Sequence, residues 1–144
     1  MSDIIWSMKP ENDSLANILS HMRDYAGTVL EAKRINYTID FPAVTDEINL
    51  PLYLKNNVYL IFKEAVNNLA KYSRCTSARI ALKIQDRKMT MQIEDNGEGF
   101  QVAEISSSGN GLLNMKKRAE ESGAQFSISS SIGKGTLIQF EKNI

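Results

Sequence analysis

Apolar residues recur at intervals of three and four in three segments of the chain, which is the spacing of one face of an α-helix. These segments cover residues 12–34, 51–72 and 111–122. Asn12, Asp13 or Ser14 can cap the first helix, and Pro51 suits the first turn of the second. The pattern therefore predicts three amphipathic helices.

Apolar and polar residues alternate in five further segments, as they do in strands that bury one face. The segments cover residues 35–42, 77–84, 88–95, 124–131 and 135–142. The polar connection of residues 85–87 predicts a hairpin between the second and third strands, and the glycine-containing "IGKG" joins the last two. Helices and strands in this order indicate an α+β fold, with helices on one face of a mixed sheet.

Composition narrows the class of protein. The chain of 144 residues fits a single domain, and its 17 basic and 17 acidic residues create no net field that would favour nucleic acid. Cys75 is the one cysteine and is interpreted as structural; with a single histidine, a zinc site is disfavoured. No apolar run approaches the roughly 20 residues of a membrane span, and the start lacks a signal peptide. We expect a cytoplasmic domain, whose parent protein could reach a membrane through another segment.

The strand of residues 88–95 ends its apolar face with an acid. Met91, Ile93 and Asp95 share that face because side chains alternate along a strand. A buried carboxylate must find a hydrogen-bond donor or shift its pKa. The alternative is that Asp95 and Asn96 simply open a turn, since Asp-Asn-Gly suits a turn in any protein.

A polar row lies on the helix predicted for residues 51–72. Glu64, Asn68 and Lys71 stand at i, i+4 and i+7, which places them beside the apolar face. The ordinary interpretation of such a row is a solvated helix face. Asn is a poor helix former in mid-helix, however, which suggests that something other than helix propensity keeps Asn68 there.

Glycines concentrate in one part of the chain: residues 93–123 hold five of the eight. Gly109 and Gly111 follow a Ser-rich run and open a helix, where backbone N–H groups without side chains suit a phosphate group. Gly133 and Gly135 sit between two strands, where a hairpin turn is the ordinary interpretation. Such a concentration suggests a segment that approaches a ligand closely.

The order of these features resembles a known family. The chain carries in turn "EAVNNLAKYS", a hairpin ending in "DNGEG", the segment "GNGLLNMKKRAEESG" and "SIGKGT". Across nearly the whole chain they resemble the ATP-binding catalytic domain of sensor histidine kinases, in the superfamily shared with gyrase, heat-shock chaperone and mismatch-repair proteins. The subgroup that pairs with LuxR-type response regulators is most similar. The resemblance implies a two-layer α/β sandwich, a mixed sheet of about five strands backed by about three helices.

The resemblance also implies a site for ATP between the sheet, a helix and a mobile lid, with residues 106–111 as the mobile part. By position, Asp95 resembles the aspartate that accepts a hydrogen bond from the adenine amino group. Gly97 and Gly99 resemble the glycines that let the chain pass close to the nucleotide. Thr136 resembles a residue near the adenine, at the end of a last glycine box.

On the phosphate side, Asn68 resembles the asparagine that ligates Mg²⁺, and Glu64 the acid that positions or activates the phosphoryl acceptor. Lys71 resembles a basic residue near the phosphates. The second glycine box, at the end of the lid, is matched by Gly109, Gly111 and Leu112. Two positions depart from the subgroup, which commonly has histidine there: Tyr72 and Asn110. Tyr72 is kept among the nucleotide-binding candidates.

The family's reaction moves the γ-phosphoryl group of Mg-ATP to a histidine on a separate two-helix dimerisation domain, and then to an aspartate of a response regulator. His21 lacks the acidic neighbour of the acceptor motif, so we expect the acceptor upstream. Residues 1–13 would be the trailing end of that helix pair, and residues 14–144 the catalytic domain. Because the family's dimer contacts belong to the helix pair, the chain itself is expected to be monomeric.

Two other functions stay open at this point. A stand-alone serine/threonine kinase of the anti-sigma-factor type has the same glycine boxes and phosphorylates a protein hydroxyl. A binding module would hold nucleotide or a regulator without chemistry. Intact Mg-ATP binding without transfer to a supplied acceptor domain would favour the binding module.

Overall fold

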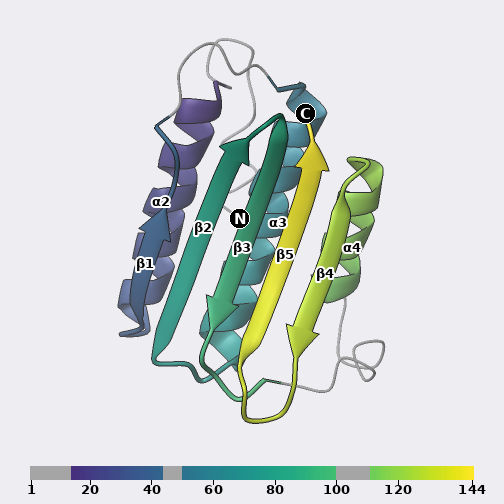
Figure 1. Cartoon of the computed structure of the whole chain (residues 1–144). Coiled ribbons are helices and arrows are strands. Elements are labelled where there is room, and N and C mark those ends of the chain that lie inside the picture. Colours follow the sequence, from purple (N-terminus) through teal and green to yellow (C-terminus); the bar gives the residue numbers. More distant parts are fainter. Residues whose placement is uncertain (1–13, 44–49, 100–110) are drawn as a thin grey trace.

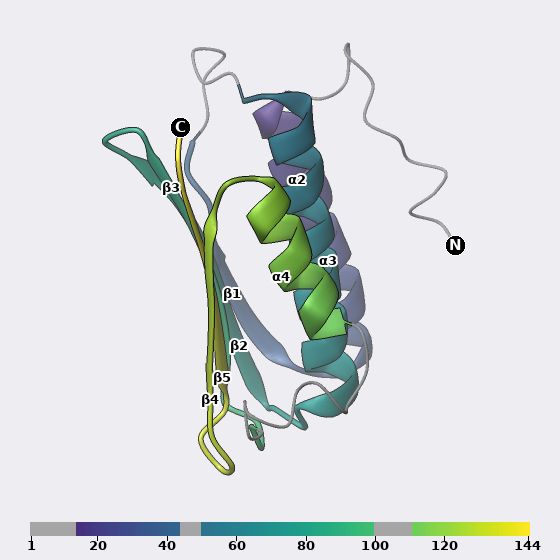
Figure 2. The ribbon, with the colours of Figure 1, turned by 90° about the vertical axis from the view of Figure 1, so that its right-hand side faces the viewer.

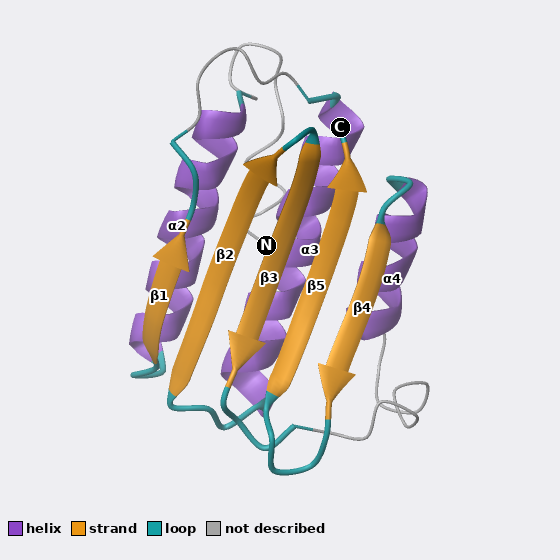
Figure 3. Ribbon diagram, viewed as in Figure 1, coloured by secondary structure: helices purple, strands orange, loops and turns teal. Residues whose placement is uncertain are grey.

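The computed structural model describes residues 14–43, 50–99 and 111–144 (Figures 1 and 3). In chain order the elements are helix α2 (Leu15–Ala32), strand β1 (Asn36–Asp40), helix α3 (Leu52–Tyr72), strands β2 (Ser77–Gln85) and β3 (Lys88–Asp95), helix α4 (Gly111–Glu121), and strands β4 (Gln125–Ser130) and β5 (Thr136–Asn143). Every predicted element is present, with ends shifted by three residues or fewer. Residues 1–13, predicted to belong to an upstream helix pair, lie outside the described residues.

The strands form one mixed sheet in the order β1-β2-β3-β5-β4. β1 and β2 are parallel, and α3 lies in the connection between them. The other neighbouring pairs are antiparallel. In this order β3 lies at the centre of the sheet, between β2 and β5 (Figure 1). The last residue of β3, Asp95, therefore has neighbours on both sides, Ala78 on β2 and Thr136 on β5.

The described helices cover one face of the sheet and make the second layer of the sandwich (Figure 2). α3 lies in the middle and packs against α2 on one side and α4 on the other. The core between the layers includes the fully buried Ile18, Phe62, Ile80, Met91 and Phe140. The opposite face of β3 is exposed at Lys88, Gln92 and Glu94, as an antiparallel sheet with one solvated face allows. The predicted α+β sandwich is confirmed.

Local chemistry accounts for several element ends. The hydroxyl oxygen of Ser14 caps α2 by accepting a hydrogen bond from the N–H of Asn17 at 3.2 Å, while the two other candidate caps lie outside the described residues. The β2–β3 hairpin turns on Asp86 and Arg87, which both have left-handed φ. The predicted three-residue connection was one residue too long, because Gln85 pairs within the ladder. None of the described helices is long and apolar enough to cross a membrane.

Candidate functional site

Asp95 ends β3 on the face covered by the helices, and the residue is 8% exposed. Its Oδ1 accepts a hydrogen bond from the backbone N–H of Gly97 at 2.8 Å. Burial raises the pKa of Asp95 above its ordinary value, the Gly97 N–H opposes the shift, and the negative charge of Glu94 adds to it. The buried carboxylate thus receives its hydrogen bond from within the Asp-Asn-Gly turn. The predicted burial of Asp95 and the alternative prediction of a turn at this position are both confirmed.

The second carboxylate oxygen of Asp95 remains accessible. Within the described part of the chain, the bond from Gly97 is the one hydrogen bond of this carboxylate. Every fully buried side-chain nitrogen or oxygen of the described residues has a partner, so the second oxygen must keep contact with solvent. A carboxylate with one oxygen bound and the other accessible is a directional acceptor for an N–H group.

Two hydroxyl groups extend this polar end of the sheet across β5 and β4. Thr136 lies opposite Asp95, and Ser130 lies opposite Thr136. The Oγ of Ser130 donates to the carbonyl oxygen of Gly135 at 3.0 Å and lies 2.9 Å from Oγ1 of Thr136. Because Ser130 has one hydroxyl hydrogen, Thr136 is then the donor in the second contact, and its lone pairs can accept from a ligand.

The glycines around Asp95 are required by the protein's own backbone. A methyl group on Gly97 would overlap the carbonyl oxygen of Ser73, and one on Gly135 would overlap the carbonyl oxygen of Asp95. Gly99, with φ +68°, meets the β4–β5 connection in the same way. The predicted hairpin turn between β4 and β5 is confirmed, and it packs directly against the loop that follows β3.

Glu64 and Asn68 project from α3 toward the start of α4. Both side chains are half-buried. A methyl group on Gly111, the first residue of α4, would overlap the Oε1 of Glu64 and lie 2.9 Å from the Nδ2 of Asn68. Leu112 packs against the hydrophobic core. The structure thus brings Glu64, Asn68 and Gly111 together, although they are far apart in the sequence.

The side chains in the last turn of α3 are not part of the cluster of Glu64, Asn68 and Gly111. Lys71 and Tyr72 are exposed, Tyr72 by 72%, and within the described residues neither makes a hydrogen bond or an ion pair. Their contacts with phosphate groups stay predictions. Gly109 and Asn110 lie outside the described residues, as does all of the predicted mobile segment 106–111 except Gly111.

Comparison with known proteins identifies the family. Residues 54–143 match the family described as histidine kinase-, DNA gyrase B-, and HSP90-like ATPase. The chain belongs to this family. The matched region begins in α3, ahead of Glu64 and Asn68, and continues through β5, so it contains Asp95, Gly111 and Thr136 as well.

The relatives of this ATPase-family chain include bacterial sensor proteins. It is 31% identical over 86 residues to sensor histidine kinase LiaS of Bacillus subtilis, and 34% identical over 94 residues to sensor protein VraS of Staphylococcus saprophyticus. The alignments cover 60% and 65% of this chain. They cover 24% of LiaS and 27% of VraS, so the chain spans about a quarter of the length of the curated relatives it matches.

Solved structures agree on the fold. The histidine kinase domain of a blue-light activated histidine kinase from Erythrobacter litoralis matches 98% of this chain and 67% of its own, with a TM-score of 0.76 and 14% identity. Full-length ShkA in complex with AMPPNP matches 90% of this chain and 30% of its own, with a TM-score of 0.68 and 14% identity. At such low identity the likeness establishes the fold alone.

The resemblance noted in the sequence analysis implies a divalent metal ion, and Glu64 and Asn68 of α3, which face the start of α4, fit Mg²⁺. Mg²⁺ is commonly held by one or two protein oxygens together with substrate phosphates, because it keeps several waters. The amide oxygen of Asn68 and the adjacent carboxylate of Glu64 supply such a sparse set, and Gly111 places no side chain between them and a ligand. In the described parts of the chain no cluster of three or more His, Cys, Asp or Glu could hold a metal ion by itself.

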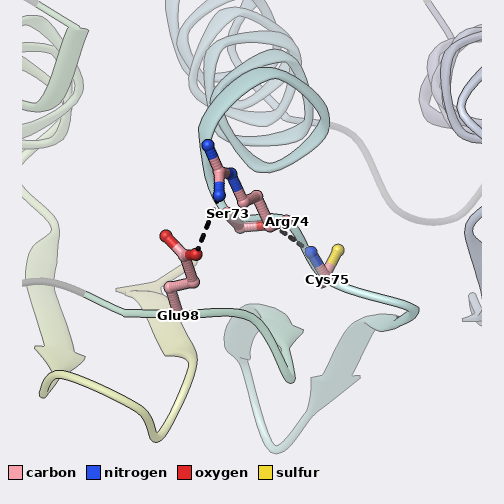
Figure 4. Close-up of polar contacts among 4 residues, drawn as sticks. All are labelled: Ser73, Arg74, Cys75 and Glu98. Atoms are coloured by element: carbon pink, nitrogen blue, oxygen red, sulfur yellow. Dashed lines mark hydrogen bonds and ion pairs between the residues drawn. The ribbon is translucent and has the colours of Figure 1, made fainter.

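The sequence analysis missed the residues that join α3 to the Asp95 loop (Figure 4). The hydroxyl of Ser73 donates to the carbonyl oxygen of Leu69 at 2.6 Å. It also accepts from the N–H of Cys75 at 3.2 Å, the bond drawn between them in Figure 4. The carbonyl oxygen of Ser73 accepts from the N–H of Glu98 at 2.7 Å. Arg74 pairs with Glu98 at 3.5 Å, but both side chains are largely exposed and the pair adds little stability. A serine after a helix is too common to have signalled this role.

Cys75 lies buried between α3 and β2. Burial raises the pKa of the Cys75 thiol, the Ser73 side chain opposes the shift, and the charge of Asp95 adds to it. A neutral, buried thiol agrees with the structural role predicted for Cys75.

Proposed function

We propose that the chain is the ATP-binding catalytic domain of a two-component sensor histidine kinase. The observation that carries the proposal is the pairing of two groups at one end of the sandwich: the half-open carboxylate of Asp95, and the Glu64–Asn68 pair at the start of α4. The resemblance to LiaS and VraS supports the same assignment. ATP is the proposed substrate, and one of the solved structures that share this fold is named as a complex with AMPPNP.

The adenine base is read at the end of β3. The accessible oxygen of Asp95 accepts from the adenine amino group, and the hydroxyl of Thr136 presents a second acceptor beside it. Because the other oxygen of Asp95 is already held by the Gly97 N–H, the carboxylate cannot rotate freely away from the ligand. Two fixed acceptors favour a base with an amino group at this position over one with a carbonyl.

The phosphates lie toward Glu64 and Asn68. Asn68 is the proposed Mg²⁺ ligand, and the bound ion would neutralise charge on the β- and γ-phosphates. Gly111 and Leu112 begin a helix whose backbone N–H groups lie next to this pair. Lys71 is an additional positive charge at the end of α3.

The transfer step needs an acceptor from a separate dimerisation domain. The imidazole nitrogen of the acceptor histidine forms a bond to the γ-phosphorus as the bond to the β,γ-bridging oxygen breaks, and ADP leaves. Glu64 holds the acceptor imidazole and takes its proton. Catalysis of this kind depends mainly on positioning and charge neutralisation.

The test is phosphotransfer from Mg-ATP to a separately produced dimerisation domain that carries the acceptor histidine. We expect a phosphoryl product that is stable in base and lost in acid, the behaviour of a phosphorylated histidine. An acid-stable product on a serine or threonine would instead identify an anti-sigma-factor-type kinase. Asn68→Ala should abolish Mg²⁺-dependent transfer while metal-free adenosine binding persists, with Asn56→Ala as the matched control at the other end of α3. Mg-ATP binding without any transfer would leave only a binding module.

The partners follow from the same proposal. The phosphorylated histidine would pass its phosphoryl group to an aspartate of a response regulator, with a LuxR-type regulator as the expected class. We further propose that the chain itself is a cytoplasmic monomer, because dimer contacts belong to the separate helix pair. A tight dimer in analytical ultracentrifugation at micromolar concentration would contradict the monomer.

A further inference from the structure

The side chain of Asn96 makes three hydrogen bonds at the junction of three strands. Its Oδ1 accepts from the backbone N–H of Thr76 at 3.0 Å and from that of Ser77 at 2.9 Å. Its Nδ2 donates to the hydroxyl of Thr76 at 3.0 Å. The backbone N–H of Asn96 also donates to the carbonyl oxygen of Ser77 at 3.2 Å. The carboxamide is therefore used inward, on the protein, and not toward a ligand.

The partners of Asn96 lie where α3 connects to β2, next to the start of β1. Thr76 and Ser77 connect α3 to β2, and the carbonyl oxygen of Thr76 accepts from the N–H of Asn36 at the start of β1. Asn96 follows Asp95, the last residue of β3. The Asn96 side chain thus links the start of β2 to the residue that follows β3, and the carbonyl of Thr76 extends this link to the start of β1.

The loop after Asp95 has a defined conformation that depends on this link. The N–H of Gly97 reaches the Asp95 carboxylate at 2.8 Å, and the N–H of Glu98 reaches the carbonyl of Ser73 at 2.7 Å. The first bond requires the Asn96–Gly97 peptide to keep its present orientation, and the second holds the next peptide, Gly97–Glu98, against Ser73. A rotation of the Asn96–Gly97 peptide would turn the Gly97 N–H away from the Asp95 carboxylate and remove the bond that fixes its orientation.

We propose that Asn96 is a positioning residue for nucleotide binding, which holds the Asp95 carboxylate in the orientation that reads the base. This inference deepens the proposed function and rests on it. Asn96 itself touches no ligand. Its effect is on the base and not on the phosphates, because its contacts all lie on the Asp95 side of the junction and none reaches Glu64 or Asn68.

The expected signature is a loss of base affinity without a loss of folding. Asn96 is exposed, so water competes for its hydrogen bonds and their contribution to stability is small. Asn96→Ala should weaken adenosine and ATP binding by the same factor, about tenfold, which corresponds to about 1.4 kcal/mol. The additional affinity that Mg²⁺ confers on ATP should stay unchanged.

Asn96→Asp is the conservative variant that should restore binding. A carboxylate oxygen still accepts from the N–H groups of Thr76 and Ser77, and the Thr76 hydroxyl can donate to the other oxygen. Adenosine affinity is therefore expected within about threefold of the parent. Asn56→Ala, the same change on an exposed position of α3, serves as the control and should bind like the parent.

The experiment is titration calorimetry of the 144-residue chain and its variants with adenosine and with ATP, with and without Mg²⁺, at a temperature where circular dichroism shows each to be folded. A folded Asn96→Ala that binds adenosine like the parent would overturn the proposal, as would an Asn96→Asp variant as weak as Asn96→Ala. If Asn96→Ala does not fold, Thr76→Val replaces it, and an unchanged adenosine affinity there overturns the proposal. A parent chain that binds neither ligand would refute the proposed function, a result visible without any variant.

Discussion

The substitution Asp95→Asn tests two properties of the buried carboxylate separately: the stability that its burial costs the fold, and the affinity that it gives for the adenine base. The Gly97 N–H needs an oxygen at the Oδ1 position, so the introduced amide must place its oxygen there and its NH₂ group at the position of the accessible oxygen. The adenine amino group then meets a donor where the parent has an acceptor. The substitution keeps the shape of the side chain and reverses the hydrogen-bonding character of its open end.

The lost interaction is a hydrogen bond to a charged group, worth about 1.5–3 kcal/mol. At 1.4 kcal/mol per decade, adenosine and ATP affinity should fall by about 10- to 100-fold. Guanosine, which carries a carbonyl where adenosine has the amino group, should lose less, so the preference for adenine should shrink.

Stability should move in the opposite direction. Burial raises the pKa of Asp95 in the folded chain, so folding favours the protonated form and the charged form is penalised. Relative to the variant, whose amide is neutral at every pH, the parent therefore loses stability as the pH rises through that raised pKa. The variant should be the more stable of the two at pH 7, and the difference should vanish below the ordinary value of 3.8.

Calorimetric titration with adenosine, guanosine and ATP measures the change in affinity, and urea unfolding from pH 7 down to about pH 3.5 measures the change in stability. Parent-like adenosine affinity in the variant would show that Asp95 does not read the base. A variant that is less stable than the parent at pH 7 would show that the charged carboxylate is satisfied within the fold, and would refute the argument from burial.

Four further substitutions test the packing of the site and of the contact between α3 and the end of α4. Gly111→Ala displaces the flexible ends of the α3 side chains, so phosphotransfer should slow by about 10- to 100-fold with little change in the urea midpoint. Gly97→Ala overlaps a backbone carbonyl and should reduce adenosine affinity, whereas Gly133→Ala, with open space around it, should bind like the parent and lose only about 1–2 kcal/mol of stability to its φ of +82°. Ser122→Ala removes the 2.9 Å hydrogen bond from the buried Asn57 and should cost about 1–3 kcal/mol in urea unfolding without affecting nucleotide binding.

Parts of the site were predicted from single positions because their signals are local. Asp95 is a charged residue at a position where the alternation of β3 calls for a buried side chain, and its burial follows from that alternation alone. Asn68 is a poor helix former within a long helix, and Glu64 lies one turn before it. The pairing of Thr136 with Asp95 could not be derived from single positions, because the register of β5 on β3 is set by the whole sheet.

The residues that the sequence analysis missed have no local signal. Ser73 and Asn96 look like ordinary turn residues. Ser73 binds the N–H of Glu98, and Asn96 binds Thr76 and Ser77, about twenty positions upstream. Gly97 was attributed to close approach to a ligand, yet it is already required by a backbone contact between loops. Gly135 was interpreted as part of a hairpin turn, and it too is required by a contact with the backbone of Asp95.

The sequence by itself determined the elements of this protein, because the helical and strand periods are set by which face of each segment must leave water. It also determined the position of the one buried acid among the described residues, since alternation places Asp95 on the face that carries Met91 and Ile93. Tertiary structure alone decided which loops meet. The order β1-β2-β3-β5-β4 brings the end of β3 beside the start of β5, so that Asp95 meets Thr136. The packing of α4 against α3 brings Glu64 to Gly111. Such contacts join residues far apart in the chain, and their geometry depends on how the layers pack, which no local period encodes.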